Sequence, residues 1–175
     1  GRTIELAVEP VSLQFGQVRL GETVTRELLV RNSGSATMQA SLTSAVEWLR
    51  VEPDLVECAP GQVQRVLVTG DTAAIGHGAR LEIPGALRVA CGEDVRVIGA
   101  FISVLQPVLT ADPAFVDFGY IDPATPAQVQ VRLANVGTGD LAWFALADAE
   151  WLEIQPTSGR CAEGGEDVVT LTAYA

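Results

Sequence analysis

The sequence contains two copies of one pattern, separated throughout by 103 residues. Identical residues recur at this spacing without an insertion: Pro10 and Pro113, Phe15-Gly16 and Phe118-Gly119, Asn32 and Asn135, Gly34 and Gly137, Glu47-Trp48-Leu49 and Glu150-Trp151-Leu152, Pro53 and Pro156, Cys58 and Cys161, Gly61 and Gly164. Solenoid repeats have periods of roughly 20–50 residues, so a period near 100 indicates whole domains in tandem. We therefore predict two domains, residues 1–105 and 106–175, joined by the short linker Gln106-Pro107-Val108, whose proline restricts the hinge.

Each copy has the periodicity of β-strands. In the second copy, Val129, Val131 and Leu133 alternate with polar residues and are followed by Asn135-Val136-Gly137. This alternation places one set of side chains against a core, and we expect a left-handed backbone at the Asn-x-Gly turn. Further strands are predicted over residues 38–42, 48–51, 63–68, 79–88 and 95–104, with one short helical turn over residues 71–75. About seven strands in 100 residues, separated by turn signals, predict an all-β sandwich.

The second copy stops before the pattern is complete. Ala175 corresponds to Thr72, so the second copy has no equivalent of residues 80–104. We therefore predict two tandem immunoglobulin-like β-sandwich domains, the second lacking its last two strands, F and G. Its strand C is then expected to be alone in its sheet, with an unpaired edge. Three explanations stay open: a shortened sequence, strands donated by a neighbouring chain, or a reduced sandwich. We favour a shortened sequence whose exposed face another copy covers.

Charge and hydropathy exclude two classes of partner. The net charge is −11, and every positively charged side chain is an arginine. Such a chain is repelled by the phosphates of nucleic acids and by anionic lipid. No apolar run approaches 18 residues, so we also expect no insertion into a membrane.

Residues for catalysis or for binding a metal or cofactor are scarce. His77 is the single histidine, and neither Ser33 nor Ser158 belongs to a Gly-x-Ser-x-Gly elbow. The carboxylates Glu47 and Glu150 occupy the same position in two domains and are not a catalytic pair. The cysteine spacing matches no zinc motif. We therefore predict no enzyme, no catalytic residue, no cofactor and no metal.

Acidic residues are concentrated in the second copy. Asp112, Asp117 and Asp122 follow one another at five-residue intervals, which raises calcium binding as a weak alternative. No calcium-binding loop motif is present, so the ordinary interpretation is a solvated acidic face.

The three cysteines leave two interpretations open. In sandwich topology, Cys58 and Cys91 lie in connections at the same end of the first domain, so they are candidates for a disulfide. Cys161 repeats Cys58, whereas the repeat of Cys91 falls beyond the sequence. The alternative is three reduced, partly buried thiols.

Four repeated aromatic residues are predicted to lie in the structural core: Phe15, Trp48, Phe118 and Trp151. Their recurrence in both copies favours an architectural role, because a large aromatic side chain stabilises a small sandwich. Trp143 differs, since its equivalent is Ala40. It is therefore the candidate for an exposed surface-binding residue.

The repeated motifs resemble known immunoglobulin-like repeats. Phe15-Gly16, Asn32-x-Gly34 and Trp48-Leu49-x-Val51-x-Pro53 resemble the abnormal-spindle and hydin (ASH) repeats, related to major sperm protein and PapD-like domains. Trp151-Leu152-x-Ile154-x-Pro156 also resembles BACON-type bacterial modules, which accompany carbohydrate-active enzymes. The resemblance implies spacing, scaffolding or adhesion without catalysis.

These observations predict a non-catalytic structural or protein-interaction module within a larger bacterial multi-domain protein. Edge strands or loops would bind a protein partner, with self-association through the incomplete second domain as one form of this. The alternative is a carbohydrate-associated adhesion module that uses Trp143. A PapD-like chaperone is a third interpretation. A location at the cell surface or outside the cell is favoured over the cytoplasm.

Overall fold

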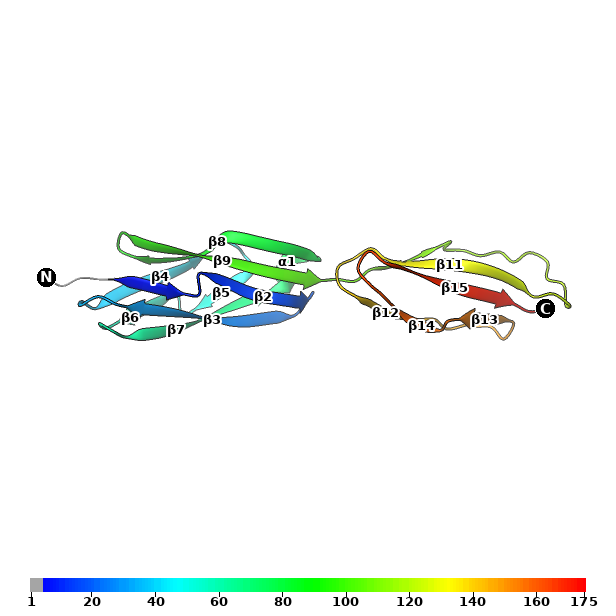
Figure 1. The fold of residues 1–175 in the computed structure, drawn as a ribbon, viewed down its shortest axis with the longest axis horizontal. Helices are drawn as coiled ribbons and strands as arrows, with labels where there is room; N and C mark the ends of the chain where they lie inside the picture. The colour runs from blue at the N-terminus through cyan, green and yellow to red at the C-terminus, as the bar shows by residue number, and fades with distance from the viewer. Residues whose placement is uncertain (1–4) are drawn as a thin grey trace. The chain divides into compact units, whose positions relative to one another are not determined.

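The chain is built almost entirely of β-strands, as the sequence predicts (Figure 1). The computed structural model describes residues 5–175, so residues 1–4 of the predicted first domain lie outside it. The strands form two compact units, with the boundary between Leu105 and Gln106. We call these the first and the second unit.

The first unit is a two-sheet sandwich. One sheet has the order β1-β3-β7-β5 and is antiparallel, with strands β1 (Leu6–Glu9), β3 (Thr23–Asn32), β7 (Val63–Asp71) and β5 (Leu49–Glu52). The other sheet has the order β2-β9-β8-β4-β6, with strands β2 (Ser12–Arg19), β9 (Asp94–Leu105), β8 (Ala79–Cys91), β4 (Met38–Ser44) and β6 (Leu55–Cys58). These orders contain the A-B-E-D and G-F-C arrangements of an immunoglobulin fold.

Alternating apolar residues of the two sheets form the core of the first unit. Leu28, Val30, Val66 and Val68 come from one sheet, and Leu87, Val89, Ile98 and Ile102 come from the other; all are fully buried. Phe15 lies edge-to-face with Trp48, with ring centroids 6.0 Å apart, and both rings are buried. The short helix α1 (Thr72–Ile75) follows β7 and is capped by Asp71, which confirms the predicted helical turn.

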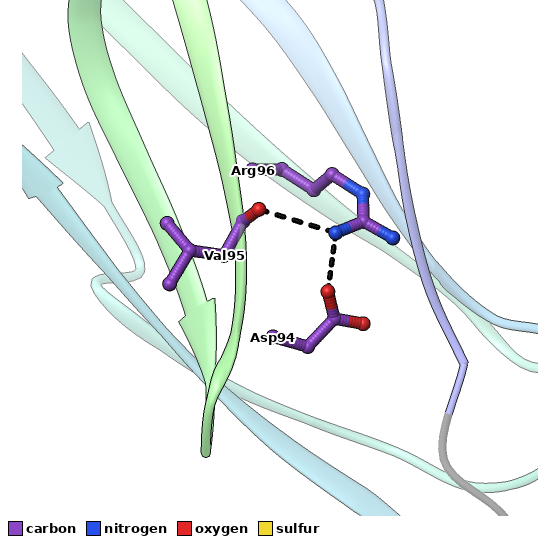
Figure 2. A network of polar contacts seen from close by, with 3 residues as sticks. All are labelled: Asp94, Val95 and Arg96. Carbon is purple, nitrogen blue, oxygen red and sulfur yellow. Dashed lines mark hydrogen bonds and ion pairs between the residues drawn. The ribbon is translucent and has the colours of Figure 1, made fainter.

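Strands β8 and β9 form one long antiparallel hairpin. Their two-residue turn, Gly92-Glu93, has a positive φ of 61° at Gly92, which suits a turn with glycine first. Next to the turn, Arg96 Nη1 donates hydrogen bonds to Asp94 Oδ1 and, at 3.1 Å, to the carbonyl oxygen of Val95 (Figure 2).

The second unit repeats six strands of the first at the 103-residue spacing. Its main sheet has the order β10-β11-β15-β13, with strands β10 (Leu109–Asp112), β11 (Ala127–Asn135), β15 (Glu166–Ala173) and β13 (Leu152–Gln155). A separate pair consists of β12 (Leu141–Phe144) and β14 (Ser158–Cys161). Among the described residues of the second unit, 106–175, no strands correspond to β8 and β9. The expectation that strand C is alone in its sheet is wrong, because its equivalent, β12, pairs with β14.

The counterpart of β2 in the second unit is residues 115–122, and it forms no strand. In the first unit, β2 is an edge strand that pairs only with β9. Without an equivalent of β9, residues 115–122 have no neighbouring strand with which to form a ladder of backbone hydrogen bonds. This absence explains why the same sequence position is a strand in one unit and irregular in the other.

The repeated asparagines are structural, but not for the expected reason. Asn32 and Asn135 are buried, and in residues 5–175 no residue other than glycine has a positive φ. Asn135 Nδ2 donates to the carbonyl oxygens of Gly139 (2.7 Å) and Cys161 (3.2 Å), and Asn32 makes the equivalent bonds to Ala36 and Cys58. The side chain therefore ties the end of a strand in one sheet to the end of a strand in the other sheet, whereas a left-handed turn was expected.

Candidate interaction site on the second unit

Within residues 5–175, no strand lies next to the outer edge of β12. In the first unit, its counterpart β4 lies between β6 and β8, whereas β12 pairs only with β14. The Ala145 N–H donates to the Thr157 carbonyl oxygen on the β14 side (2.8 Å). Because backbone groups alternate in direction along a strand, the N–H and C=O of Phe144 point to the opposite, free side. β12 therefore offers an unpaired edge for strand addition.

An apolar groove of about 340 Å³ lies beside this edge. We call it the open face; among the residues that line it are Val116, Val131, Leu133, Ile154, Val169 and Leu171. Val131, Leu133 and Leu171 are only half-buried, whereas their counterparts Leu28, Val30 and Val68 are fully buried. The open face is therefore a core surface that, in the first unit, faces the sheet containing β8 and β9.

The aromatic pair at one end of the second unit is also uncovered. Phe118 lies edge-to-face with Trp151, with ring centroids 6.2 Å apart, as Phe15 does with Trp48. However, Trp151 is 51% exposed, whereas Trp48 is 7% exposed. The prediction that Trp151 is a core residue is therefore wrong, and Phe118 is only half-buried. The pair keeps its core geometry, but residues 106–175 contain no counterparts of β8 and β9, which complete the second sheet of the sandwich in the first unit.

A polar contact lies beside these rings. The Tyr174 hydroxyl donates a hydrogen bond to Glu153 Oε2 at 2.8 Å. This bond raises the pKa of the Tyr174 phenol above its ordinary value, because it favours the protonated form.

Trp143 is buried, which overturns its assignment as an exposed binding residue. Its side chain is 6% exposed, and its Nε1 donates a hydrogen bond to Asp167 Oδ2 at 2.7 Å. The indole covers Gly159, the residue opposite it on β14. The corresponding pair in the first unit is Ala40 opposite Val56. The large residue of the pair is therefore on β12 in the second unit and on β6 in the first unit. This exchange of a large and a small residue is visible in the sequence at the 103-residue spacing.

The three cysteines are free and buried, so the candidate disulfide between Cys58 and Cys91 is absent. Cys58 ends β6 and Cys91 ends β8, and β4 lies between these two strands. Two strand spacings amount to about 9–10 Å, whereas a disulfide needs Cα atoms within about 7 Å. The expectation failed because it placed both residues in loops at one end of the domain.

We predict that all three thiols titrate in the unfolded chain without reductant and are protected in the native chain. Burial raises the pKa of the Cys58 thiol, so it stays protonated and unreactive at neutral pH. The measurement is the number of thiols that react with an aromatic disulfide reagent in buffer and in denaturant. Fewer than three reactive thiols in denaturant would show that a bridge forms.

Other candidate chemistry finds little support in residues 5–175. Asp117 Oδ1 and Asp122 Oδ1 accept hydrogen bonds from the backbone N–H groups of Gly119 and Ala124. Within this range, no group of three or more His, Cys, Asp or Glu side chains is placed to hold a metal ion. No helix in the same range has the length and apolar character needed to cross a bilayer.

A family model described as the viral BACON domain matches residues 5–86 and 108–175. The chain belongs to this family. One matched segment lies in each unit, and the first segment ends at residue 86, within β8. No curated protein matches the chain.

Solved structures share the fold at low sequence identity. A protein of unknown function from Porphyromonas gingivalis W83 is 14% identical, with a TM-score of 0.51 over 97% of this chain and 83% of that chain. The chaperone–tip adhesion subunit complex CsuC–CsuE of Acinetobacter baumannii is 10% identical, with a TM-score of 0.42 over 93% and 88%. The E. coli chaperone DraB is 12% identical, with a TM-score of 0.42 over 95% and 85%. At these identities the likeness concerns the fold alone.

Proposed function

We propose that this chain is a non-catalytic protein-interaction module that binds its partner by β-strand addition at the second unit. The observation that carries the proposal is the free edge of β12 next to the open face. A strand added at this edge would gain backbone hydrogen bonds from β12 and would cover apolar side chains that are now half-exposed.

The sequence contains few residues suited to catalysis, which supports a non-catalytic function. His77 has no second histidine to join it, and no nucleophile motif is present in the sequence. We further propose that the two units belong to a larger bacterial protein at the cell surface or outside the cell. The resemblance of the motifs around Phe15 and Asn32 to ASH repeats supports the proposal that the two units are part of a larger protein.

The carbohydrate-adhesion alternative relied on Trp143 as an exposed residue, but Trp143 is only 6% exposed. Trp151 is exposed, but its counterpart Trp48 is a core residue, which favours an uncovered core over a sugar-binding platform. A glycan array tests the alternative: we expect no hit that depends on Trp151, and a hit lost in Trp151→Ala would favour adhesion.

The test of strand addition uses displayed random extended peptides selected on the full chain. We expect the selected peptides to bind the wild type and Phe144→Val, and to lose binding to Phe144→Pro. Proline removes the Phe144 N–H from the free edge but leaves the bond from Ala145 to β14 in place. Valine is the matched control, because it keeps the N–H and strand propensity. Peptides that bind Phe144→Pro as tightly as the wild type would refute strand addition at β12.

A further inference from the structure

We infer that the segment accepted by the second unit is a two-stranded antiparallel β-hairpin, which lies between β12 and residues 115–122. This inference rests on the strand-addition function proposed above and specifies its partner. The hairpin would take the place that β8 and β9 occupy in the first unit.

The sheet topology leaves room for two strands. In the first unit, β8 and β9 separate β4 from β2 in the order β2-β9-β8-β4-β6. In the second unit, the counterparts of β4 and β6 pair with each other, and the counterpart of β2, residues 115–122, forms no strand. A single added strand would pair with β12 and leave residues 115–122 without a partner. Two added strands would pair both with β12 and with residues 115–122. A hairpin therefore fits this space better than a single strand.

The repeat also gives the register. The pairing of β4 with β8, shifted by 103 residues, places the first hairpin strand opposite Phe144, Ala145 and Leu146. The parallel pairing of β2 with β9 places the second hairpin strand beside Phe115 and Tyr120. The side chains of Phe115, Tyr120, Phe144 and Leu146 are all more than 70% exposed. Large apolar side chains thus remain uncovered along both edges that the hairpin would join.

The first unit also shows what side chains the hairpin needs. The inward residues of β8 and β9 are Leu87, Val89, Ile98, Ala100 and Ile102, each no more than 2% exposed. The hairpin for the second unit therefore carries aliphatic residues at alternate positions, which pack against the open face.

The net charge of the second unit indicates which charge the hairpin should carry. Residues 106–175 carry 10 acidic residues and 2 arginines, a net charge of −8, whereas residues 1–105 have a net charge of −3. Outward-facing basic residues on the hairpin would complement this charge and favour encounter. The partner is thus an amphipathic hairpin with an aliphatic inner face and a basic outer face.

The β8–β9 hairpin of this chain is a suitable probe of the aliphatic inner face, since residues 79–105 carry three arginines and three acidic residues and no net charge. It has a tight turn of its own and the local contacts of Arg96 with Asp94 and Val95 (Figure 2). An isolated hairpin is marginally stable in water, so a synthetic peptide of residues 79–105 is expected to fold when it binds.

The experiment titrates the full chain with this peptide and with two single-strand peptides, residues 79–91 and 94–105, by calorimetry. We expect 1:1 binding of the hairpin, at least about tenfold tighter than either single strand, which corresponds to ~1.4 kcal/mol. Val116→Asp, which puts a charge into the open face, should weaken binding by at least about tenfold. Val136→Asp is the matched control, since Val136 is exposed outside the groove, and it should bind as the wild type does. Hydrogen exchange should show new protection at residues 115–122.

Each contrary outcome has a definite meaning. If a single strand binds as tightly as the hairpin, the two-stranded partner is refuted but strand addition stands. If the hairpin fails to bind while displayed peptides bind at β12, the inference fails alone. If Val116→Asp binds the hairpin as tightly as the wild type, the peptide occupies another surface, such as the first unit, and the inference fails. If sedimentation shows a dimer that blocks the peptide, the partner is a second copy of the chain.

Discussion

Replacing Gly159 with valine is expected to lower the free energy of unfolding of the second unit by about 2–3 kcal/mol. A Cβ atom at Gly159 would lie 2.7 Å from Cζ2 and 2.9 Å from Cε2 of the Trp143 ring. The ring cannot move aside freely, because it is buried and its Nε1 is bonded to Asp167. Ala142→Val, on the exposed face of the neighbouring strand, is the control and should change the stability by less than about 0.5 kcal/mol.

The double variant Trp143→Ala/Gly159→Val makes this prediction more specific. Trp143→Ala alone should cost about 3–5 kcal/mol, because it leaves a large cavity. The double variant recreates the Ala40–Val56 pair of the first unit, so the valine fills part of that cavity. We expect the two losses to be non-additive by at least ~2 kcal/mol in denaturant unfolding of the second unit. If the two losses in free energy of unfolding simply add, Trp143 and Gly159 do not share one core position as Ala40 and Val56 do.

The second large effect compares equivalent tryptophans in the two units. Trp48→Ala should destabilise the first unit by about 3–5 kcal/mol, because Trp48 is buried against Phe15. Trp151→Ala should cost the second unit only about 2 kcal/mol, because half of its surface is already in water. Calorimetric unfolding of the two variants of the full chain measures both values. Equal losses would mean that Trp151 is covered in solution.

Much of the fold could be predicted from the sequence, because the repeat and the alternation are local patterns. The 103-residue spacing predicted which strands recur in the second unit. Alternation placed β7 and β9 close to their observed limits. These features depend on a residue's neighbours in the chain, which the sequence displays directly.

The exposure of individual side chains could not be predicted in the same way. Phe118 and Trp151 have the motif of a core pair, yet they are uncovered because the strands that close the sandwich have no equivalent in the second unit. Trp143 was misassigned because its position was considered without Gly159, the small residue across the strand pair that accommodates it. The predicted disulfide between Cys58 and Cys91 was wrong because β4 lies between the two strands that end in these residues. Each error concerns a contact between strands distant in the sequence.

The central claim is that the edge of β12 is open where the equivalent edge of β4 is paired. Residue-resolved hydrogen exchange at Phe144 and at its counterpart Ser41 tests this claim most directly. The Ser41 N–H points toward β8, because the neighbouring Leu42 N–H donates to Asp54 on the opposite side. We predict that the Phe144 amide exchanges at least about a hundredfold faster than the Ser41 amide. Equal protection of the two amides would show that the edge is already paired and would contradict the account.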